Sequence, residues 1–116
     1  MADAVLFLGW KCAVPGREQQ AMDLFQKVME YYAKSQSEGK IESSEPVLLR
    51  SHGGDLNGFI LIKGDTEKLS KFAQEDTFNE HCIEAAYCLD GFGVIPGAFG
   101  EKLSRNFSIW SKQFGK

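Results

Sequence analysis

The sequence predicts an α+β fold in which strands and helices follow one another in the order β-α-β-β-α-β. Two observations predict it. Short apolar segments that suit strands are separated by longer segments whose apolar residues recur at helical spacing. Turns that contain glycine or proline mark the boundaries between these segments. With 116 residues, 43% of them hydrophobic and 25% charged, the chain suits a single globular domain over residues 1–116.

The first expected strand spans residues 5–12, and the first expected helix spans residues 17–37. In the strand, Leu6 and Phe7 point to opposite faces, so both faces begin apolar. A Pro-Gly turn ends the strand. The helix is the clearest element, because one of its faces is apolar and the opposite face is polar. The apolar residues at helical spacing are Ala21, Leu24, Phe25, Val28, Met29 and Tyr32.

Residues 41–51 and 59–63 are expected to form the two strands of a hairpin. The segment between them contains a Gly-Gly pair and an Asn-Gly pair, which favour tight loops. Pro46 cannot donate a hydrogen bond to a strand ladder. The early part of the first of these two strands therefore lies at a sheet edge or a bulge.

A second helical region follows the hairpin. Asp65 and Thr66 suit an N-cap for its first part. Asp76 or Thr77 suits the start of a second part, which runs to about Cys88. The apolar stripe of this second part consists of Phe78, Cys82, Ala85 and Leu89.

A fourth strand is expected over residues 92–95, ended by a Pro-Gly pair. The C-terminal extension, residues 101–116, suits two interpretations. The alternation of Phe107, Ile109 and Ser111 is typical of a strand. A spacing of four, three and four, typical of a helix, relates Leu103, Phe107, Trp110 and Phe114. Large apolar side chains do not stay in water, so we expect this extension to pack on the core or on a partner.

The order β-α-β-β-α-β is that of the ferredoxin-like fold, a four-stranded antiparallel sheet with two helices on one face. Two helices cover only one face of such a sheet, whereas the strands at residues 5–12 and 59–63 begin apolar on both faces. The uncovered face would expose an apolar patch that is large for a monomer. We therefore expect a homodimer in which the sheet of a second copy covers this patch, face to face or as a shared barrel.

The chain resembles the dimeric α/β-barrel superfamily, which includes the antibiotic-biosynthesis-type monooxygenases. The resemblance rests on the element order across nearly the whole chain and on a strand that leads into an Asp-Thr-capped helix. These segments read Asn57-Gly58-Phe59-Ile60-Leu61-Ile62 and Gly64-Asp65-Thr66-Glu67-Lys68-Leu69. The resemblance implies a dimeric α/β barrel. Members of the superfamily include cofactor-free oxygenases, haem-degrading enzymes, isomerases and proteins of no known activity, so the resemblance does not fix a reaction.

Composition excludes several classes of function. A net charge of −3 argues against a nucleic-acid-binding surface, which carries a basic stripe. The first residues lack the positive region of a signal peptide, and no stretch approaches the ~20 apolar residues that cross a bilayer. Three cysteines without a CxxC pair argue against a disulfide framework and suit a reducing cytoplasm. The sequence therefore predicts a cytoplasmic protein that binds neither nucleic acid nor membrane.

Two groups of residues suit acid–base chemistry. His81 borders the apolar stripe of the second helical region, and Glu84 and Cys88 follow along the same edge, so the three suit a base, its orienting partner and a nucleophile. The same pattern also suits a boundary histidine beside a solvated glutamate. His52 and Asp55 flank the Gly-Gly pair and suit a His–Asp dyad, or polar residues that cap an exposed loop.

Cofactor and metal chemistry are not expected. Haem-degrading members of the superfamily use an Asn, a Trp and a His. His81 matches the His only loosely, Phe72 or Phe78 stands where the Trp is expected, and the first strand carries no Asn. The chain has two histidines and no clustered ligand spacing, so we expect no metal site.

Trp10, Tyr32 and Phe78 are large aromatic residues that suit either core packing or the wall of an apolar pocket. The preferred interpretation is a homodimer that holds a small apolar ligand between sheet and helices. One alternative is an enzyme, either a cofactor-independent monooxygenase or an isomerase or dehydratase with His81 or His52 as base. The other is an oligomerisation or regulatory module without a pocket.

Overall fold

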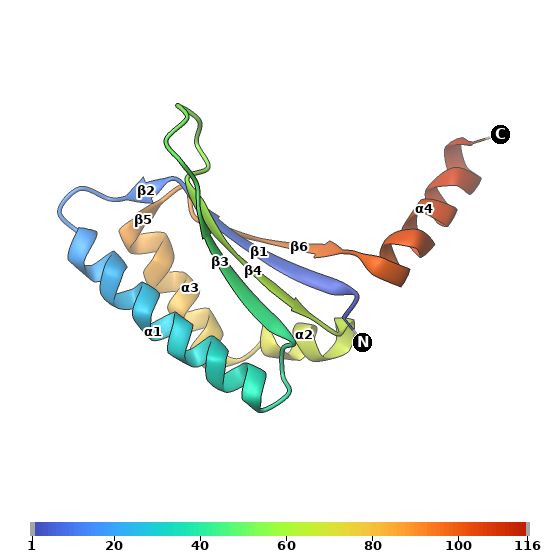
Figure 1. The fold of residues 1–116 in the computed structure, drawn as a ribbon, viewed down its shortest axis with the longest axis horizontal. Coiled ribbons are helices and arrows are strands. Elements are labelled where there is room, and N and C mark those ends of the chain that lie inside the picture. Colours follow the sequence, from blue (N-terminus) through green and yellow to red (C-terminus); the bar gives the residue numbers. More distant parts are fainter. Residues whose placement is uncertain (1, 116) are drawn as a thin grey trace.

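A central antiparallel sheet, helices on one of its faces and a projecting C-terminal helix make up residues 2–115, which the computed structural model describes (Figure 1). In chain order the elements are β1 (Ala4–Trp10), β2 (Cys12–Ala13), α1 (Glu18–Ser37), β3 (Ser43–Leu48), β4 (Gly58–Gly64), α2 (Thr66–Phe72), α3 (Asp76–Cys88), β5 (Leu89–Asp90), β6 (Gly93–Ala98) and α4 (Gly100–Phe114).

The sheet has the strand order β3-β4-β1-β6, so β1 and β4 are central and β3 and β6 are edges. Leu8 in β1 pairs with Ile60 in β4 and with Val94 in β6, and all neighbours are antiparallel. A separate short ladder joins β2 to β5. Helices α1 and α3 cover the same face of the sheet (Figure 1). The predicted α+β, ferredoxin-like architecture is confirmed.

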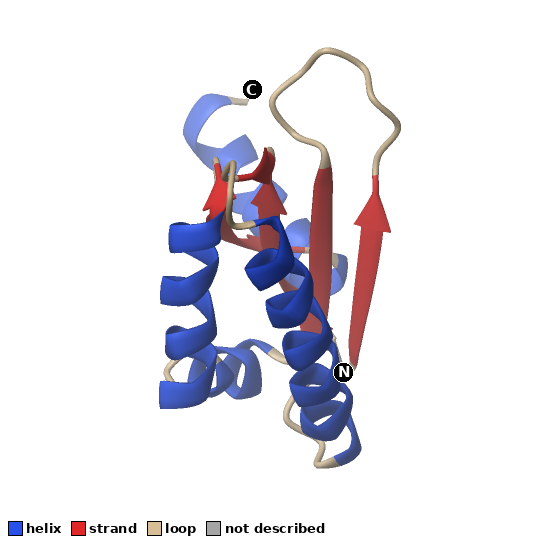
Figure 2. Cartoon of the chain, turned by 90° about the vertical axis from the view of Figure 1, so that its left-hand side faces the viewer, coloured by secondary structure: helices blue, strands red, loops and turns tan. Residues whose placement is uncertain are grey.

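The core lies between the sheet and these two helices, which stand side by side in front of the strands in Figure 2. Buried positions alternate with half-buried ones along β4, as expected for a strand with one face on the core. The apolar stripe predicted for α1 faces the core through Leu24, Val28 and Tyr32. Burying each large apolar side chain contributes roughly 1.5–3 kcal/mol.

Several strand boundaries differ from the prediction. The strand predicted over residues 5–12 ends at Trp10, and Cys12–Ala13 forms the separate strand β2, which pairs with β5. β6 continues through Pro96 and Gly97, where an end was predicted, because an edge strand tolerates a missing N–H donor. The strand predicted over residues 41–51 is shorter, and its last part belongs instead to the loop that leads to β4. Pro46 lies in β3, which is an edge strand as predicted.

The second helical region divides into α2 and α3, as predicted. The side chain of Asp65 accepts a hydrogen bond from the backbone N–H of Lys68 at 3.2 Å, which confirms it as the N-cap of α2. The N-cap of α3 is Glu75, whereas Asp76 or Thr77 was predicted. Glu75 makes no side-chain capping hydrogen bond, so the helix starts one or two residues before the predicted caps without a capping side chain.

The face of the sheet away from α1 and α3, here called the open face, is also apolar. Phe7 in β1 lies opposite Leu61 in β4 and Ile95 in β6, so these three side chains share this face. The apolar residues of the open face are Val5, Phe7, Val47, Phe59, Leu61 and Ile95, all half-buried or exposed. Glu45 and Lys63 lie on the same face and form an ion pair at 3.4 Å. Both faces of the central strands are therefore apolar, as predicted, and coverage by a second copy stays a prediction.

The C-terminal extension is the helix α4, so the strand interpretation is wrong. It contains no buried residue. Its large apolar side chains Phe107, Trp110 and Phe114 are each more than half exposed. In Figure 1, α4 projects away from the rest of the chain. The extension was predicted to pack either on the core or on a partner. It does not pack on the core of its own chain, and packing on a partner stays a prediction.

Candidate functional site

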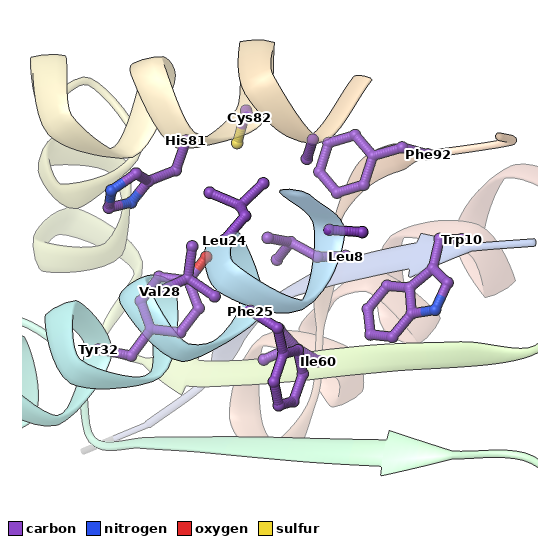
Figure 3. Close-up of a pocket in the computed structure, with 12 residues that line it drawn as sticks. Leu8, Trp10, Leu24, Phe25, Val28, Tyr32, Ile60, His81, Cys82 and Phe92 are labelled. Atoms are coloured by element: carbon purple, nitrogen blue, oxygen red, sulfur yellow. The ribbon is translucent and has the colours of Figure 1, made fainter. Parts of the chain in front are cut away.

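A small cavity of about 40 Å³ lies between the sheet and helices α1 and α3 (Figure 3). We call it the inner pocket. Its wall is apolar apart from four groups, the indole N–H of Trp10, the hydroxyl of Tyr32, the imidazole of His81 and the thiol of Cys82. The lining residues are Leu8, Trp10, Ala21, Leu24, Phe25, Val28, Tyr32, Ile60, His81, Cys82, Ala85 and Phe92.

Local sequence explains how Trp10 is held in the wall of the inner pocket. The ring of Trp10 meets Phe25 edge to face, with centroids 6.5 Å apart. Across the strands, Trp10 pairs with Gly58, and a Cβ atom there would lie 2.6 Å from Cζ2 of the indole. Gly58 therefore provides the space in which the Trp10 ring packs flat against the sheet. Gly58 is the first residue of β4 and has no positive φ, so this glycine serves the close approach of Trp10 and not the tight turn predicted for the Asn-Gly pair.

The acidic groups of the inner pocket are neutral at ordinary pH. Burial raises the pKa of the Tyr32 phenol well above its usual value of 10.0. Burial also raises the pKa of the Cys82 thiol to about 11. Since a thiol at neutral pH is a poor nucleophile, Cys82 acts here as a small apolar residue with a weak donor.

His81 is 9% exposed, and its Nδ1 atom has no hydrogen-bond partner among residues 2–115. Its ring meets the Tyr31 ring edge to face at 5.2 Å. Burial, and next the positive charge of Lys27, lower its pKa, which Glu84 and Glu80 raise to a smaller extent. In Figure 3 both ring nitrogens lie on the side of the ring away from Cys82. The imidazole is therefore neutral, but it does not aim into the pocket.

The predicted partners of His81 are engaged elsewhere. The carboxylate of Glu84 accepts a hydrogen bond from Gln20 at 3.2 Å and lies 4.0 Å from the ammonium of Lys27. Cys88 is fully buried, and burial raises its pKa. The structure thus places these residues on one helix edge, as the spacing predicted, without joining them into a base, an orienting partner and a nucleophile.

The His52 and Asp55 pair lies in the exposed β3–β4 loop. Nδ1 of His52 accepts a hydrogen bond from the N–H of Gly54 at 3.3 Å, so Nε2 donates to the carbonyl of Leu56 at 2.7 Å. Asp55 is 94% exposed and lies 3.7 Å from Lys11. The loop therefore follows the alternative interpretation, in which its polar residues cap their own turn, and the His–Asp dyad is not formed.

A larger hollow of about 490 Å³ runs between the edge strand β6 and helices α2 and α3. We call it the edge groove. Its volume falls within the range of roughly 300–1,000 Å³ typical of ligand sites. The lining residues are Ala4, Val5, Leu6, Thr66, Leu69, Ser70, Ala73, Phe78, Asn79, Cys82, Val94, Pro96, Gly97 and Lys102. Cys82 lines both hollows, so the edge groove and the inner pocket meet at this side chain.

The three aromatic residues that the sequence analysis singled out all line one of the two hollows. Trp10 and Tyr32 line the inner pocket, and Phe78 lines the edge groove. Binding by these residues stays a prediction. Four polar residues line the edge groove, Thr66, Ser70, Asn79 and Lys102. Sequence reasoning noted Thr66 only as part of a helix cap and missed the other three, because nothing local distinguishes them from solvated helix residues. Pro96, which was interpreted as the end of the strand, lies within β6, and a proline inside a strand is a local signal for the sheet edge that the groove follows.

Residues 2–115 contain no group of three or more His, Cys, Asp or Glu side chains placed to hold a metal ion. None of the helices in this described range is both long enough and apolar enough to cross a membrane.

No protein-family model matches the chain, and no curated protein matches it. Among the solved structures that it resembles is a dimeric protein of unknown function and ferredoxin-like fold from Bacteroides fragilis. That match has a TM-score of 0.61 and 10% identity, and covers 84% of this chain and 96% of that chain. Another is SnoaB, a cofactor-independent oxygenase from Streptomyces nogalater. Its TM-score is 0.50 with 17% identity, over 84% of this chain and 92% of SnoaB. These likenesses show the ferredoxin-like fold.

Proposed function

We propose that this ferredoxin-like protein is a homodimer that binds a small apolar molecule between its sheet and its helices. The observation that carries the proposal is the edge groove, whose volume of about 490 Å³ suits a small organic ligand. Apolar side chains of Leu69, Phe78 and Val94 line the groove together with Ser70 and Asn79. A few polar groups in an apolar wall are typical of a site that orients a ligand.

The dimer part of the proposal is supported by the open face. Isolated apolar residues on a surface are normal, but a contiguous apolar patch on a central sheet is typical of an interface. The Bacteroides fragilis protein of the same fold is described as dimeric. The three free cysteines are compatible with the reducing compartment expected from the sequence.

Calorimetric titration with 1-naphthol, a small apolar phenol, tests the ligand part. Ser70 is exposed at the edge groove, so Ser70→Phe fills part of the groove with little risk to folding. We expect this variant to bind about tenfold more weakly than the wild type, a loss of about 1.4 kcal/mol. Ser37→Phe at the exposed end of α1 is the matched control and should bind as the wild type does. Equal affinity of all three proteins, or no binding by the wild type, overturns the ligand proposal.

A second candidate function is catalysis without a cofactor, as a monooxygenase or as an isomerase or dehydratase. It is favoured by the position of His81 in the wall of the inner pocket, because the lone pair of a neutral imidazole is the group that a general base uses, although burial makes this one a weaker base than a solvated histidine. Its ring must first turn toward Cys82. Oxygen uptake with 1-naphthol that His81→Gln abolishes would support the monooxygenase. Binding without any turnover would leave the ligand-binding function as the better description.

A further inference from the structure

The exposed helix α4 presents an apolar stripe that no other part of residues 2–115 covers. The stripe consists of Leu103, Phe107, Trp110 and Phe114, which are 40%, 62%, 59% and 72% exposed. Their spacing of four, three and four places them on one side of the helix. A hollow of about 220 Å³ lies along this stripe, lined by Leu103, Asn106, Phe107 and Trp110. Such a face is shaped to receive another surface.

The starting direction of α4 is fixed by the fold. The N–H of Phe99 donates to the carbonyl of Asp3 at 3.0 Å, which ties the beginning of α4 to the start of β1. Gly100 follows with a φ of +60°, a conformation that glycine adopts without strain. In Figure 1 the helix leaves the end of β6 on the side of the sheet opposite α1 and α3. A second copy placed on the open face therefore lies beside α4.

The apolar area also points to a shared interface. A fully buried aromatic side chain removes roughly 150–250 Å² from water. With the exposures above, the stripe offers roughly 400 Å² of apolar surface, about half of the ~800 Å² that each partner contributes to a standard interface. The open face, which is continuous with the start of α4 through β6, supplies further apolar surface.

Charge also favours a second copy of the chain as the surface that covers α4. α4 carries three basic residues, Lys102, Arg105 and Lys112, against one acidic residue, Glu101. Residues 1–99 hold all but one of the 16 acidic residues of the chain and all but four of its 13 basic residues. The basic helix is therefore attracted to the acidic domain of another copy.

We propose that α4 is an arm that reaches across the dimer and packs its apolar stripe on residues 2–99 of a second copy. By two-fold symmetry, the α4 helix of that copy packs on residues 2–99 of the first. The inference rests on the homodimer proposed above and adds to it. A basic amphipathic helix also suits an anionic membrane surface. The second copy is the better occupant, because the open face beside α4 needs a cover and a membrane would leave it bare.

The first test compares dimer dissociation constants by sedimentation equilibrium. In Phe107→Glu/Trp110→Glu, two charges interrupt the stripe, and we expect dimerisation to weaken by at least about thirtyfold. Ser104→Glu/Ser108→Glu adds the same charges outside the stripe and is the matched control, expected to change the constant less than about threefold. All four residues are exposed, so folding is not at risk. An unchanged constant in the first variant overturns the arm and leaves the homodimer standing.

Fluorescence of Trp110 in a Trp10→Phe background identifies the occupant. We expect blue-shifted emission in the dimer that moves to the red on dilution below the dissociation constant. Blue emission at every concentration means that α4 packs on its own chain, and red emission in an intact dimer means that α4 is free. A blue shift only with phosphatidylserine vesicles means that a membrane covers the stripe. Each of these three results overturns the arm, and a wild type that stays monomeric at millimolar concentration overturns both proposals.

Discussion

The ring of Phe7 stacks on the ring of Phe59, with centroids 4.9 Å apart and ring planes inclined by 27°, on the open face of the sheet. Such a pair contributes roughly 0.5–1.5 kcal/mol beyond its burial of area. The pair is not covered by α1 or α3, which lie on the opposite face (Figure 1). Two stacked rings in the middle of a sheet thus form the centre of the surface on which the proposed dimer depends.

Substitution on the open face should separate dimerisation from folding. Ile95 is 60% exposed on the edge strand β6, so Ile95→Glu places a charge in the proposed interface without disturbing the stacked rings. We expect this variant to be monomeric at concentrations where the wild type is dimeric, because an unpaired carboxylate is costly to bury. Sedimentation equilibrium measures this. Met22→Glu, at 63% exposure on α1, is the control and should remain dimeric.

A polar network should make the free energy of unfolding depend on pH in acid. The carboxylate of Glu75 accepts a hydrogen bond from the Tyr31 hydroxyl and lies 2.8 Å from the ammonium of Lys40. The Lys40 contact, and next the Tyr31 contact, lower the pKa of Glu75 below its usual 4.5. The stabilisation is therefore present above pH 4.5 and lost as pH falls through the depressed pKa of the folded state.

Glu75→Gln tests this network by urea unfolding at several pH values. The variant should be less stable than the wild type above pH 4.5, and the difference should shrink as the pH falls below that value. Glu30→Gln, on the exposed side of α1, controls for the loss of a carboxylate. A constant difference between Glu75→Gln and the wild type at all pH values would contradict the prediction.

Replacing His81 should remove a second pH dependence. Burial, and then Lys27, lower the pKa of His81 below 6.5, so the unfolded chain takes up a proton that the folded chain refuses. The wild type should lose stability as pH falls from 6.5 to the lower pKa of the folded state, whereas His81→Leu should not. Because Nδ1 is buried without a partner, we also expect His81→Leu to gain about 1 kcal/mol at neutral pH.

The matched control for this experiment is His52→Leu in the exposed loop. Its free energy of unfolding should keep the pH dependence that His81→Leu removes. Guanidinium unfolding between pH 5 and 8 measures both variants. If His81→Leu is less stable than the wild type, the imidazole contributes a contact that the geometry of residues 2–115 does not reveal.

The three thiols should react at very different rates. Cys12 is exposed, Cys82 is half-buried and Cys88 is buried. The thiolate is the reactive form, and burial raises the pKa of Cys82 to about 11 and also raises that of Cys88. Iodoacetamide at pH 8 should therefore label Cys12 at least about tenfold faster than the other two. Mass spectrometry of the peptides measures the rates. In urea, where the chain is unfolded, we expect the three thiols to react at equal rates. Equal rates in the folded protein would contradict the burial of Cys82.

The N-cap of α2 should be worth a measurable free energy. Asp65→Ala removes the hydrogen bond to the N–H of Lys68, and we expect a loss of about 1 kcal/mol of unfolding free energy. Glu67→Ala in the exposed first turn is the control and should cost less than about half of that. Thermal unfolding measures both. Equal effects would show that charge near the helix start matters more than the cap itself.

Most of the fold could be predicted from local pattern. The helical stripe of α1, the Asp65 cap of α2 and the apolar central strands each follow from the spacing of a few residue types. The candidate site could be predicted only in part. Trp10 and Tyr32 were predicted to serve either core packing or a pocket wall, and both line the inner pocket. The pairing of His81 with Glu84 was not realised, because Gln20 and Lys27 on α1 contact the carboxylate. Those contacts join residues 64 and 57 positions apart, which no local spacing reveals.

The sequence by itself determined the order of the main elements and the two apolar faces of the central strands. These properties depend on which side of a strand or helix each residue faces, and that is fixed by the period of the backbone. Only the tertiary structure decided that Cys82 separates two hollows, that His81 turns its nitrogens away from one of them, and that α4 leaves its own domain. Such features depend on how distant elements meet in space, where side-chain volumes and the direction of a single turn at Gly100 decide the outcome.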